Sequence, residues 1–551
     1  MPKPSLLFYF LCLLPTYAFS QNSQTVGRED VVDAFRADRF KQHVAILASD
    51  SFIGRKPFTK GESLTIDFLE RQFKQMGLEP GNSNSYLQAV PMVNIQATAA
   101  PHMQVQSLKG NLTLKAFDDY IIWTDKTDEH ISLDNSELVF AGYGVVAPEY
   151  QWNDYEGLDV KGKVVMVMVN DPGFWIGDTT LFKGKEMTYY GRWMYKFEEA
   201  ARQGAKGCLI IHNTVAAGYP FSVQQNSFNT SRLQLDNRGK AIKNCDVIGW
   251  VPQAVANQLF TAGGFDSTLL TKANKPGFKA VPLNLNLSTT MTVKTTYNRS
   301  YNVIGKIKGS KRPDEVIIYT AHWDHLGIGK PDETGDSIYN GALDNATGTA
   351  GLLEMAKAFK TLKTRSERTI VFLSVTAEEQ GLLGSAYYAQ NPIYPAKKTV
   401  ANINMDGLNP FTRTRDIVIV GKGQSELEDY LDDEIKKDSG YISFDTHPEA
   451  GYYYRSDHFN FAKAGIPALH ASTGIDVVGK GKEYGQKLLD EYTAKHYHQP
   501  SDEYDLSTWT ADGAIHHLTL LFQVGRRLAF GSKWPQWLAG SEFKAIRESK
   551  K

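Results

Sequence analysis

Hydrophobic and polar positions follow two different periods along this chain. The spacing of one helix face is kept by five apolar residues: Leu64, Phe68, Leu69, Phe73 and Met76. Gly77 follows them directly and predicts the end of that helix. Short apolar runs at 86–94 and 121–124 predict strands or extended connections. The first part of the chain therefore combines one amphipathic helix with extended segments.

Between residues 134 and 290 the pattern changes to short apolar runs separated by loops rich in glycine and proline. We expect strands at 139–146, 164–169, 207–211 and 247–251. Residues 198–203 indicate a helix. This composition predicts a small β-rich module inserted into the chain.

Between residues 295 and 535, strand-like and helix-like segments alternate. The run at 316–319 is apolar at every position, which is typical of a strand covered on both faces. Further strands are predicted at 370–375, 400–404, 417–420 and 468–471, and helices at 346–359 and 382–389. Alternation of this kind predicts an α/β fold, with a mostly parallel twisted sheet and helices on both faces.

Length and composition agree with a large globular protein. The 551 residues exceed what one hydrophobic core usually holds, so we expect three units at 27–133, 134–290 and 295–535. Hydrophobic residues make up 42% and charged residues 22%, which is typical of a soluble enzyme. The net charge of -1 gives no electrostatic reason to expect binding to nucleic acid or to an anionic membrane.

The first 20 residues have the layout of a cleavable export signal. Lys3 precedes an apolar run at 6–14, and small residues follow at Ala18 and Ser20. The run is shorter than the roughly 20 residues that a membrane span requires. We therefore expect a periplasmic or secreted protein with no stable membrane span after cleavage, and a short membrane anchor is the alternative.

Two cysteines, Cys208 and Cys245, lie beyond this signal. Cys208 sits in an apolar strand-like run, where a buried and unreactive thiol is expected. A disulfide between the two is the alternative in an oxidising compartment.

Several side chains that can act as metal ligands come just after the predicted strands. His322 follows 316–319, Glu378 and Glu379 follow 370–375, and Asp406 follows 400–404. Ligands gather at the carboxyl ends of parallel strands, so these groups are expected to converge on one edge of the sheet. Each motif alone occurs often by chance, and their joint order and placement carry the prediction.

Two histidines and three carboxylates fit a site for two zinc ions, because zinc prefers imidazole nitrogen and carboxylate oxygen. Zinc ions about 3.5–4 Å apart require a shared ligand. Asp344 is the candidate bridge, since it lies between small residues ahead of a predicted helix. One ion would be held by His322 and Asp406, and the other by Glu379 and His498.

Glu378 has a different expected role from Glu379, because adjacent side chains cannot point at one metal in the same way. Glu378 is the candidate general base, which takes a proton from the attacking water and passes it to the leaving amine. Asp324 is expected to accept a hydrogen bond from His322 and to fix its orientation. The other histidines, including His325, are expected in core, loop or supporting positions.

With these motifs, the chain resembles the M28 family of zinc peptidases. The resembling segments are 321–327, 341–348, 376–381, 404–407, 456–459 with 465–467, and 497–502. The resemblance implies that His322, Asp344, Glu379, Asp406 and His498 bind two zinc ions. It further implies that Glu378 is the base and that Asp324 supports His322. Tyr453, one of three consecutive tyrosines, is the candidate for stabilising an oxyanion, with a packed aromatic residue as the alternative.

Residues 153–163 and 200–211 are similar to a protease-associated domain, which in this family flanks the active-site cleft without catalysing the reaction. The resemblance covers nearly all of the chain after the signal. It implies peptide substrates and favours an aminopeptidase. The alternatives are a carboxypeptidase, for which Arg455 and Arg413 could bind a substrate carboxylate, a glutaminyl cyclase-like enzyme, and a binding protein without activity. The oligomeric state is left open.

Overall fold

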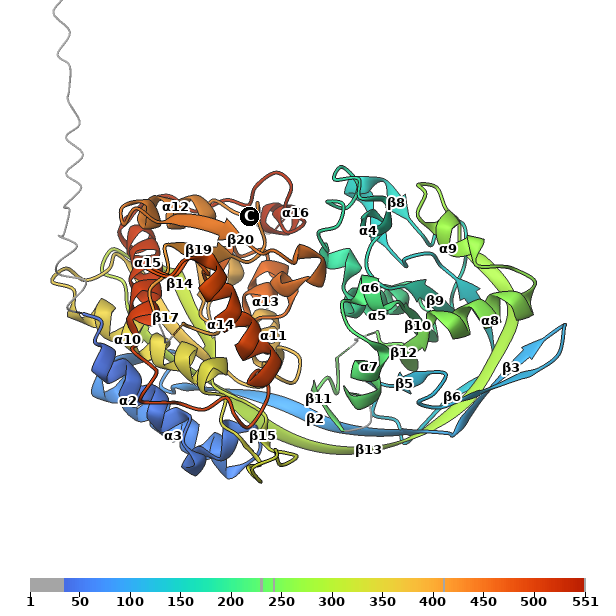
Figure 1. Cartoon of the computed structure of the whole chain (residues 1–551), viewed down its shortest axis with the longest axis horizontal. Coiled ribbons are helices and arrows are strands. Elements are labelled where there is room, and N and C mark those ends of the chain that lie inside the picture. The colour runs from blue at the N-terminus through green and yellow to red at the C-terminus, as the bar shows by residue number, and fades with distance from the viewer. Residues whose placement is uncertain (1–33, 228–230, 241–242, 410–411, 550–551) are drawn as a thin grey trace, which may run out of the picture.

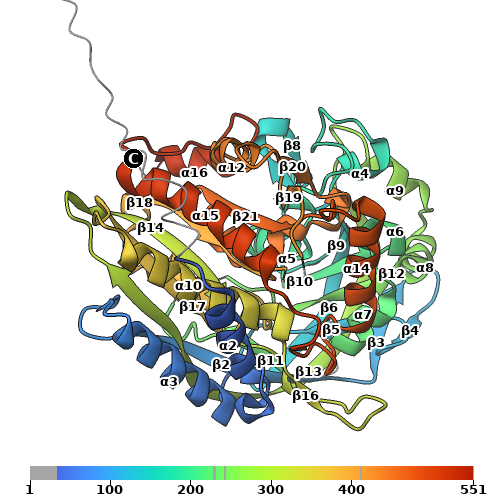
Figure 2. The same cartoon turned by 60° about the vertical axis from the view of Figure 1, so that its left-hand side comes forward.

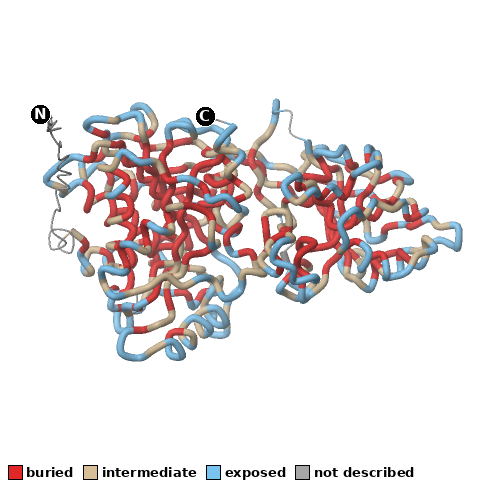
Figure 3. The backbone as a smooth tube through the Cα atoms, turned by 90° about the horizontal axis from the view of Figure 1, so that it is seen from above, coloured by how far each residue is buried: buried red, intermediate tan, exposed pale blue. Residues whose placement is uncertain are grey.

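The computed structural model describes residues 34–227, 231–240, 243–409 and 412–549. Two lobes lie side by side, and the paired strands β2 (Leu87–Ala99) and β13 (Val281–Ile307) run along both (Figure 1). We call residues 34–90 and 300–549 the first lobe and residues 91–299 the second lobe. Each lobe has its own buried interior (Figure 3). The predicted export signal at residues 1–20 lies outside the described residues.

The first lobe is built around one twisted sheet. Its strands lie in the order β13, β17 (Arg368–Val375), β14 (Arg312–His322), β18 (Thr399–Asn404), β21 (Ala468–Thr473), β19 (Asp416–Ile419) and β20 (Tyr441–Phe444). β17, β14, β18 and β21 are parallel, whereas β19 runs antiparallel to β21. The mostly parallel sheet predicted from the sequence is confirmed, and so are the strands predicted within it.

Helices cover both faces of this sheet, as predicted. One face carries α2 (Ala37–Leu47), α3 (Lys60–Gln75), α10 (Thr347–Thr361) and α15 (Asp512–Phe530), and α2 contacts α10 directly (Figure 2). The other face carries α11 (Leu383–Gln390) and α13 (His458–Lys463). Successive residues of a strand point to opposite faces. Ile317 and Tyr319 therefore enter the first core, and Val316 and Ile318 enter the second.

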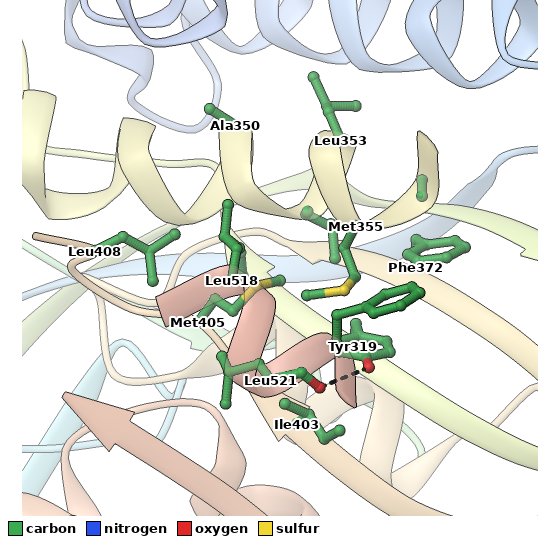
Figure 4. Packing of buried hydrophobic residues seen from close by; sticks show 14 of the residues in the cluster. Tyr319, Ala350, Leu353, Met355, Phe372, Ile403, Met405, Leu408, Leu518 and Leu521 are labelled. Carbon is green, nitrogen blue, oxygen red and sulfur yellow. Dashed lines mark hydrogen bonds between the residues drawn. The ribbon is translucent and has the colours of Figure 1, made fainter. Parts of the chain in front are cut away.

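Side chains from the sheet and from α10 and α15 interlock in the larger core (Figure 4). Tyr319 is fully buried there, and its hydroxyl donates a hydrogen bond to the backbone oxygen of Leu521 at 3.1 Å. A buried hydroxyl is costly unless it is hydrogen-bonded. The contact therefore fixes α15 against β14.

The helix predicted from residues 64–76 is confirmed as α3. Thr59 caps its amino end by accepting a hydrogen bond from the backbone N–H of Gly61 at 3.2 Å. Gly77 follows its carboxyl end with φ of +70°, a conformation that glycine adopts without strain.

The second lobe contains a parallel group of strands, β6 (His130–Phe140), β9 (Val164–Met168), β10 (Gly207–His212) and β12 (Val247–Pro252). The antiparallel strand β5 (Ile121–Trp123) pairs with β12. The helices α5 (Trp193–Arg202) and α8 (Gln253–Gly263) pack beside them. The lobe also contains β3 (His102–Ser107), β4 (Leu112–Lys115), β11 (Arg232–Leu235) and α9 (Thr268–Ala273).

One strand prediction in this lobe was wrong in length. The strand expected at 139–146 ends at Phe140, because Gly142 and Gly144 have positive φ values of +52° and +63° and turn the chain. The unit boundary predicted between residues 133 and 134 falls inside β6, and the one predicted at 290–295 falls inside β13. The protease-associated character of the second lobe stays a prediction.

Cys208 and Cys245 are buried free thiols in one hydrophobic cluster of the second lobe. Burial raises the pKa of Cys208 well above its usual range and that of Cys245 to about 12. The unreactive-thiol interpretation is therefore the one that the structure supports. Across the described ranges, no helix is both long enough and apolar enough to cross a bilayer.

Candidate metal centre

Three adjacent parallel strands end at the same edge of the first-lobe sheet. In the register of the sheet, His322 of β14 lies beside Val375 of β17, and Thr320 of β14 lies beside Asn404 of β18. Glu378 and Glu379 follow β17, and Asp406 follows β18. The convergence expected from the strand ends is therefore present.

Asp344 faces two different histidines with its two carboxylate oxygens. Oδ1 lies 3.2 Å from Nε2 of His322, and Oδ2 lies 3.2 Å from Nε2 of His498. His322 Nε2 also lies 3.2 Å from Oδ1 of Asp406. On the other side, His498 Nε2 lies 3.1 Å from Oε2 of Glu379. The five predicted ligands thus form two histidine–carboxylate pairs, with Asp344 between them.

The backbone around Asp344 has a shape that few residues permit. Gly341 precedes the turn at Ala342–Ala346 with φ of +54°, and a Cβ atom there would lie 2.3 Å from the backbone oxygen of Asp344. The neighbouring Asn345 connects this turn to the loop that carries Asp406. Its Nδ2 donates to the backbone oxygen of Met405 at 3.1 Å, and its Oδ1 accepts from the backbone N–H of Gly407 at 3.2 Å.

Glu378 and Glu379 point to different partners. Oε1 of Glu379 lies 2.6 Å from Nδ1 of His325, while its Oε2 faces His498. Oε2 of Glu378 lies 3.9 Å from Nε2 of His322, outside hydrogen-bond distance. Of the two adjacent carboxylates, that of Glu379 therefore lies between two histidines, and that of Glu378 makes no hydrogen bond among the described residues.

Asp324 supports the cluster differently from the expectation. Nδ1 of His322 lies 3.1 Å from the backbone oxygen of Asp324, but 3.9 Å from its Oδ1. The carboxylate instead accepts a hydrogen bond from the backbone N–H of Glu378 at 3.0 Å. Burial raises the pKa of Asp324 to about 8, although His322 opposes the shift. Asp324 therefore positions both His322 and Glu378.

The histidines and carboxylates shift one another's pKa values strongly. Burial would lower the pKa of His498, but Glu379 and Asp344 raise it to about 10. Burial and Asp344 would raise the pKa of Glu379, but His325 and His498 lower it to about 2. Burial raises the pKa of Glu378 well above its usual range, with His322 opposing. Glu378 is thus the member of the adjacent pair that holds a proton more readily.

The donor atoms fit a metal better than they fit one another. Nε2 of His498 is buried and makes no hydrogen bond within the described part of the chain, although two carboxylate oxygens face it. Ligand atoms of His322, Asp344 and Asp406 all lie within 4.8 Å of one another, and so do those of His325, Asp344 and Glu379. Imidazole nitrogen and carboxylate oxygen at this spacing are the donor set that zinc prefers.

A serine hydroxyl supports Asp406. Oγ of Ser456 donates to Oδ2 of Asp406 at 2.5 Å and accepts from Nδ2 of Asn404 at 2.8 Å. The oxygen of Asp406 that faces away from His322 is therefore held in place.

Tyr453 and Tyr497 occupy different environments. Tyr453 packs edge-on against His458, with ring centroids 4.7 Å apart, and its buried hydroxyl has no partner among the described residues. Burial is the main cause that raises the pKa of Tyr453. Glu542 and Glu428, which are not members of the cluster, raise it further. This geometry favours the packed-aromatic interpretation of Tyr453.

Tyr497 is a candidate that the sequence analysis missed. Its ring stacks on His498 with centroids 3.9 Å apart. The residue is 48% exposed, and partial desolvation, followed by Asp344 and three further carboxylates, raises the pKa of Tyr497 above its usual range. The phenol therefore stays protonated beside the cluster, as a hydrogen-bond donor must. Its position next to His498 was the available signal.

Comparisons with known proteins find one family model and several partly similar proteins. Residues 302–523 match the model of peptidase family M28. A probable zinc metalloprotease of Pyricularia oryzae is 37% identical over 107 residues, which cover 19% of each chain. Aminopeptidase YwaD of Bacillus subtilis is 32% identical over 189 residues, which cover 33% of this chain and 37% of that protein.

The chain thus spans between about a fifth and two fifths of the length of these relatives. Among solved structures, an aminopeptidase from Aneurinibacillus sp. strain AM-1 is 17% identical, with a TM-score of 0.49 and coverage of 92% of this chain and 97% of that chain. All residues of the histidine–carboxylate cluster lie within the matched range 302–523. The segment 302–523, which carries the cluster, therefore matches peptidase family M28.

Proposed function

We propose that the chain is a co-catalytic two-zinc exopeptidase, and specifically an aminopeptidase that releases N-terminal residues from peptides. One observation carries the proposal: the two oxygens of Asp344 face two separate histidine–carboxylate pairs at 3.2 Å. A single, largely buried carboxylate shared between two such pairs is the arrangement that a two-metal site requires. The resemblance of segments of the chain to a zinc metalloprotease and an aminopeptidase supports the same proposal.

In this proposal His322 and Asp406 hold one zinc ion, and Glu379 and His498 hold the other. Asp344 is shared by both. His325 fixes Glu379 through the 2.6 Å contact of its Nδ1, which leaves Oε2 of Glu379 free to act as the ligand.

Zinc, when bound, supplies Lewis acidity that makes water more acidic and polarises the carbonyl group of the substrate. Glu378 is the proposed general base, because its carboxylate lies beside the cluster and burial raises its pKa. It would accept the proton of the attacking water and deliver it to the leaving amine. The protonated phenol of Tyr497 is the proposed donor to the carbonyl oxygen as negative charge develops there.

One carboxylate favours a substrate with a free amino end. Asp344, Asp406 and Glu379 would be neutralised as zinc ligands, which leaves Glu378 as the carboxylate beside the metals to which an amino group is attracted. The predicted export signal makes extracellular or periplasmic peptides the proposed substrates. The second lobe, which contacts the first lobe through the packing of Tyr189 against Phe459, is proposed to flank the peptide.

A carboxypeptidase is the second candidate, and a pair of arginines at the junction of the lobes favours it. Nε of Arg192 is buried without a hydrogen-bond partner among the described residues, and its Cδ would lie 3.5 Å from a Cβ atom at Gly451. Burial and the nearby guanidinium of Arg455 lower the pKa of Arg192 to about 10. A substrate carboxylate could bind there. Arg413, by contrast, already lies 3.6 Å from Asp438.

A panel of short peptides tests the two candidates. Each peptide is prepared free, acetylated at the amino end and amidated at the carboxyl end, and hydrolysis is measured with and without a zinc chelator. An aminopeptidase hydrolyses the amidated peptides but not the acetylated ones. A carboxypeptidase hydrolyses the acetylated peptides but not the amidated ones.

The same panel with Arg192→Gln separates the role of the arginine pair. Unchanged hydrolysis by this variant would exclude Arg192 as a binding group for the substrate carboxylate. Hydrolysis that resists the chelator contradicts the zinc mechanism. A cyclised product from N-terminal glutamine, or zinc binding without any turnover, would favour a glutaminyl cyclase-like enzyme or a binding protein instead.

A further inference from the structure

The backbone amides at Asp344 are bound by a carboxylate from a distant part of the chain. Oδ1 of Asp502 accepts the N–H of Leu343 at 3.0 Å, and Oδ2 accepts the N–H of Asp344 itself at 3.1 Å. The backbone oxygen of Asp502 accepts the N–H of Ala342 at 2.9 Å. Asp502 is 2% exposed, and Tyr492 donates its hydroxyl to Oδ2 at 3.2 Å.

The other side of the same turn is bound by a buried guanidinium. Arg55 is 1% exposed, and its donors reach four backbone carbonyl oxygens. Nη1 reaches Asn340 at 2.6 Å, Nη2 reaches Gly341 at 2.8 Å, and Nε reaches Trp323 at 2.9 Å. The fourth bond ties Nη1 to Leu47 in α2 at 2.7 Å. Arg55 therefore holds together the segment that follows His322 and the turn that precedes Asp344.

The charges of these two residues complement each other. Within the described residues, no carboxylate lies within ion-pair distance of Arg55, yet Asp502 is the carboxylate that affects it most. Burial lowers the pKa of Arg55 to about 10, so the side chain stays charged at neutral pH. Asp502, which receives two amide hydrogen bonds, supplies the opposite charge. Neither buried charge is left without compensation.

A carboxylate that contacts two partners must be held in one orientation. Asp344 can offer one oxygen to each histidine pair only while its backbone keeps the present direction. Asp502 holds that backbone through its N–H groups, and Arg55 holds the two residues just before the turn through their carbonyl oxygens. Groups that orient metal ligands in this way typically change metal affinity by about 10- to 100-fold when they are removed.

We propose that Asp502, assisted by Arg55, is a positioning residue that sets the bridging orientation of Asp344 and thereby couples the two metal positions. This inference rests on the proposed function, because it assumes that Asp344 binds both ions. It assigns a role to the last residue of the segment 497–502, four positions after His498. The segment then supplies both a ligand and the group that orients the shared ligand.

Zinc affinity measured by competition with a fluorescent chelator tests the proposal. Asp502→Asn keeps the size of the side chain but presents an NH2 group to one of the two backbone N–H donors. We expect zinc binding to weaken about 10- to 100-fold at both positions together. Asp505→Asn is the matched control and should bind zinc like the wild type. Asp505 lies three residues away, and its side chain bonds, among the described residues, only to Ser507 and Thr508.

Cobalt(II) alone supplies a second readout that a purely structural role would not change. At saturation, Asp502→Asn should alter the visible spectrum of bound cobalt, since the orientation of Asp344 changes. Tyr492→Phe, which removes one hydrogen bond to Asp502, should give a smaller shift and serves if Asp502→Asn does not fold. Wild-type zinc affinity with a wild-type cobalt spectrum in either folded variant overturns the inference. Failure of the wild type to bind zinc overturns the proposed function instead.

Discussion

At the scale of single residues, neighbouring carboxylates acquire opposite properties from their surroundings. Glu378 and Glu379 are adjacent and chemically identical, yet burial raises the pKa of the first, while His325 and His498 lower the pKa of the second to about 2. The direction of each side chain at the end of β17 decides this difference. The proposed roles of Glu378 as base and Glu379 as ligand thus rest on which histidines each carboxylate faces.

Glu378→Gln should keep both metal ions and lose most turnover. The amide occupies the same space but cannot accept a proton, and positioned bases typically contribute about 10²- to 10⁴-fold. Turnover of a sensitive peptide and zinc content by elemental analysis are the measurements. Glu379→Gln is the matched control and should lose zinc. Turnover of Glu378→Gln at the wild-type rate would remove this residue from the role of base.

Tyr497→Phe should lower turnover while leaving zinc content unchanged. Removing one donor to a developing oxyanion typically costs about 10²- to 10³-fold in turnover. Tyr453→Phe is the control, and it should retain activity because the buried hydroxyl of Tyr453 has no hydrogen-bond partner among the described residues. A large loss in Tyr453→Phe together with normal turnover in Tyr497→Phe would reverse the assignment.

At this scale the sequence was sufficient to predict which side chains converge, because three of the five candidate ligands, His322, Glu379 and Asp406, follow apolar runs that form buried strands. It was insufficient for the groups that orient them. Asp502, Arg55 and His325 act through contacts across distances in sequence that no local pattern records. The expected side-chain bond between Asp324 and His322 is made by a backbone oxygen instead.

At the scale of elements, close packing between α15 and β14 depends on one glycine. A Cβ atom at Gly525 would lie 1.7 Å from the hydroxyl oxygen of Tyr319 and 2.7 Å from the adjacent ring carbon. Alanine favours a helix by about 1 kcal/mol over glycine, but overpacking a core typically costs about 1–3 kcal/mol. The second effect should dominate at this position.

Gly525→Ala should therefore lower the denaturant midpoint of the first lobe. The loss should be smaller in a Tyr319→Phe background, since the atom nearest to the added methyl group is then absent. Urea unfolding of the two single variants and the double variant gives the coupling between them. A rise in the midpoint of Gly525→Ala would show that helix propensity dominates.

The same helix carries a buried histidine that makes stability depend on pH. Burial lowers the pKa of His517 to about 3, and the nearby His516 and His470 contribute to this shift. The imidazole of His517 is therefore neutral in the folded protein. The unfolded chain takes up a proton below about pH 6.5. The stability that this residue contributes is therefore present above pH 6.5 and falls by about 1.4 kcal/mol per pH unit as the pH drops toward 3.

His517→Gln should reduce the loss of stability between pH 7 and pH 5. Urea midpoints at the two pH values are compared with those of the wild type and of His130→Gln, a control at an exposed position. Equal pH dependence in wild type and His517→Gln would contradict this account of the buried ring.

Elements made of continuous apolar runs were predicted well, whereas β13 was not. Its first half alternates exposed polar residues with buried ones, and no apolar run marks it as one strand. Only its pairing with β2, β3 and β6 creates the 27-residue strand. Long-range pairing of this kind decides strand length, which explains why a unit boundary was expected inside it.

At the scale of the whole molecule, two lobes, each with its own hydrophobic core, contact each other. Lys463 and Glu198 form an ion pair across the junction at 3.0 Å, and Tyr189 packs against Phe459. The sequence indicated a change of character between the regions, but nothing in it specified which surfaces meet. Contacts between lobes depend on side chains that are each unremarkable in local context.

The central claim is that one cluster in the first lobe holds two zinc ions bridged by Asp344. Diffraction from zinc-loaded crystals at the zinc absorption edge tests it most directly. The account predicts two anomalous peaks about 3.5–4 Å apart, one beside His322 and Asp406 and the other beside His498 and Glu379. A single peak, or peaks away from these side chains, would contradict it.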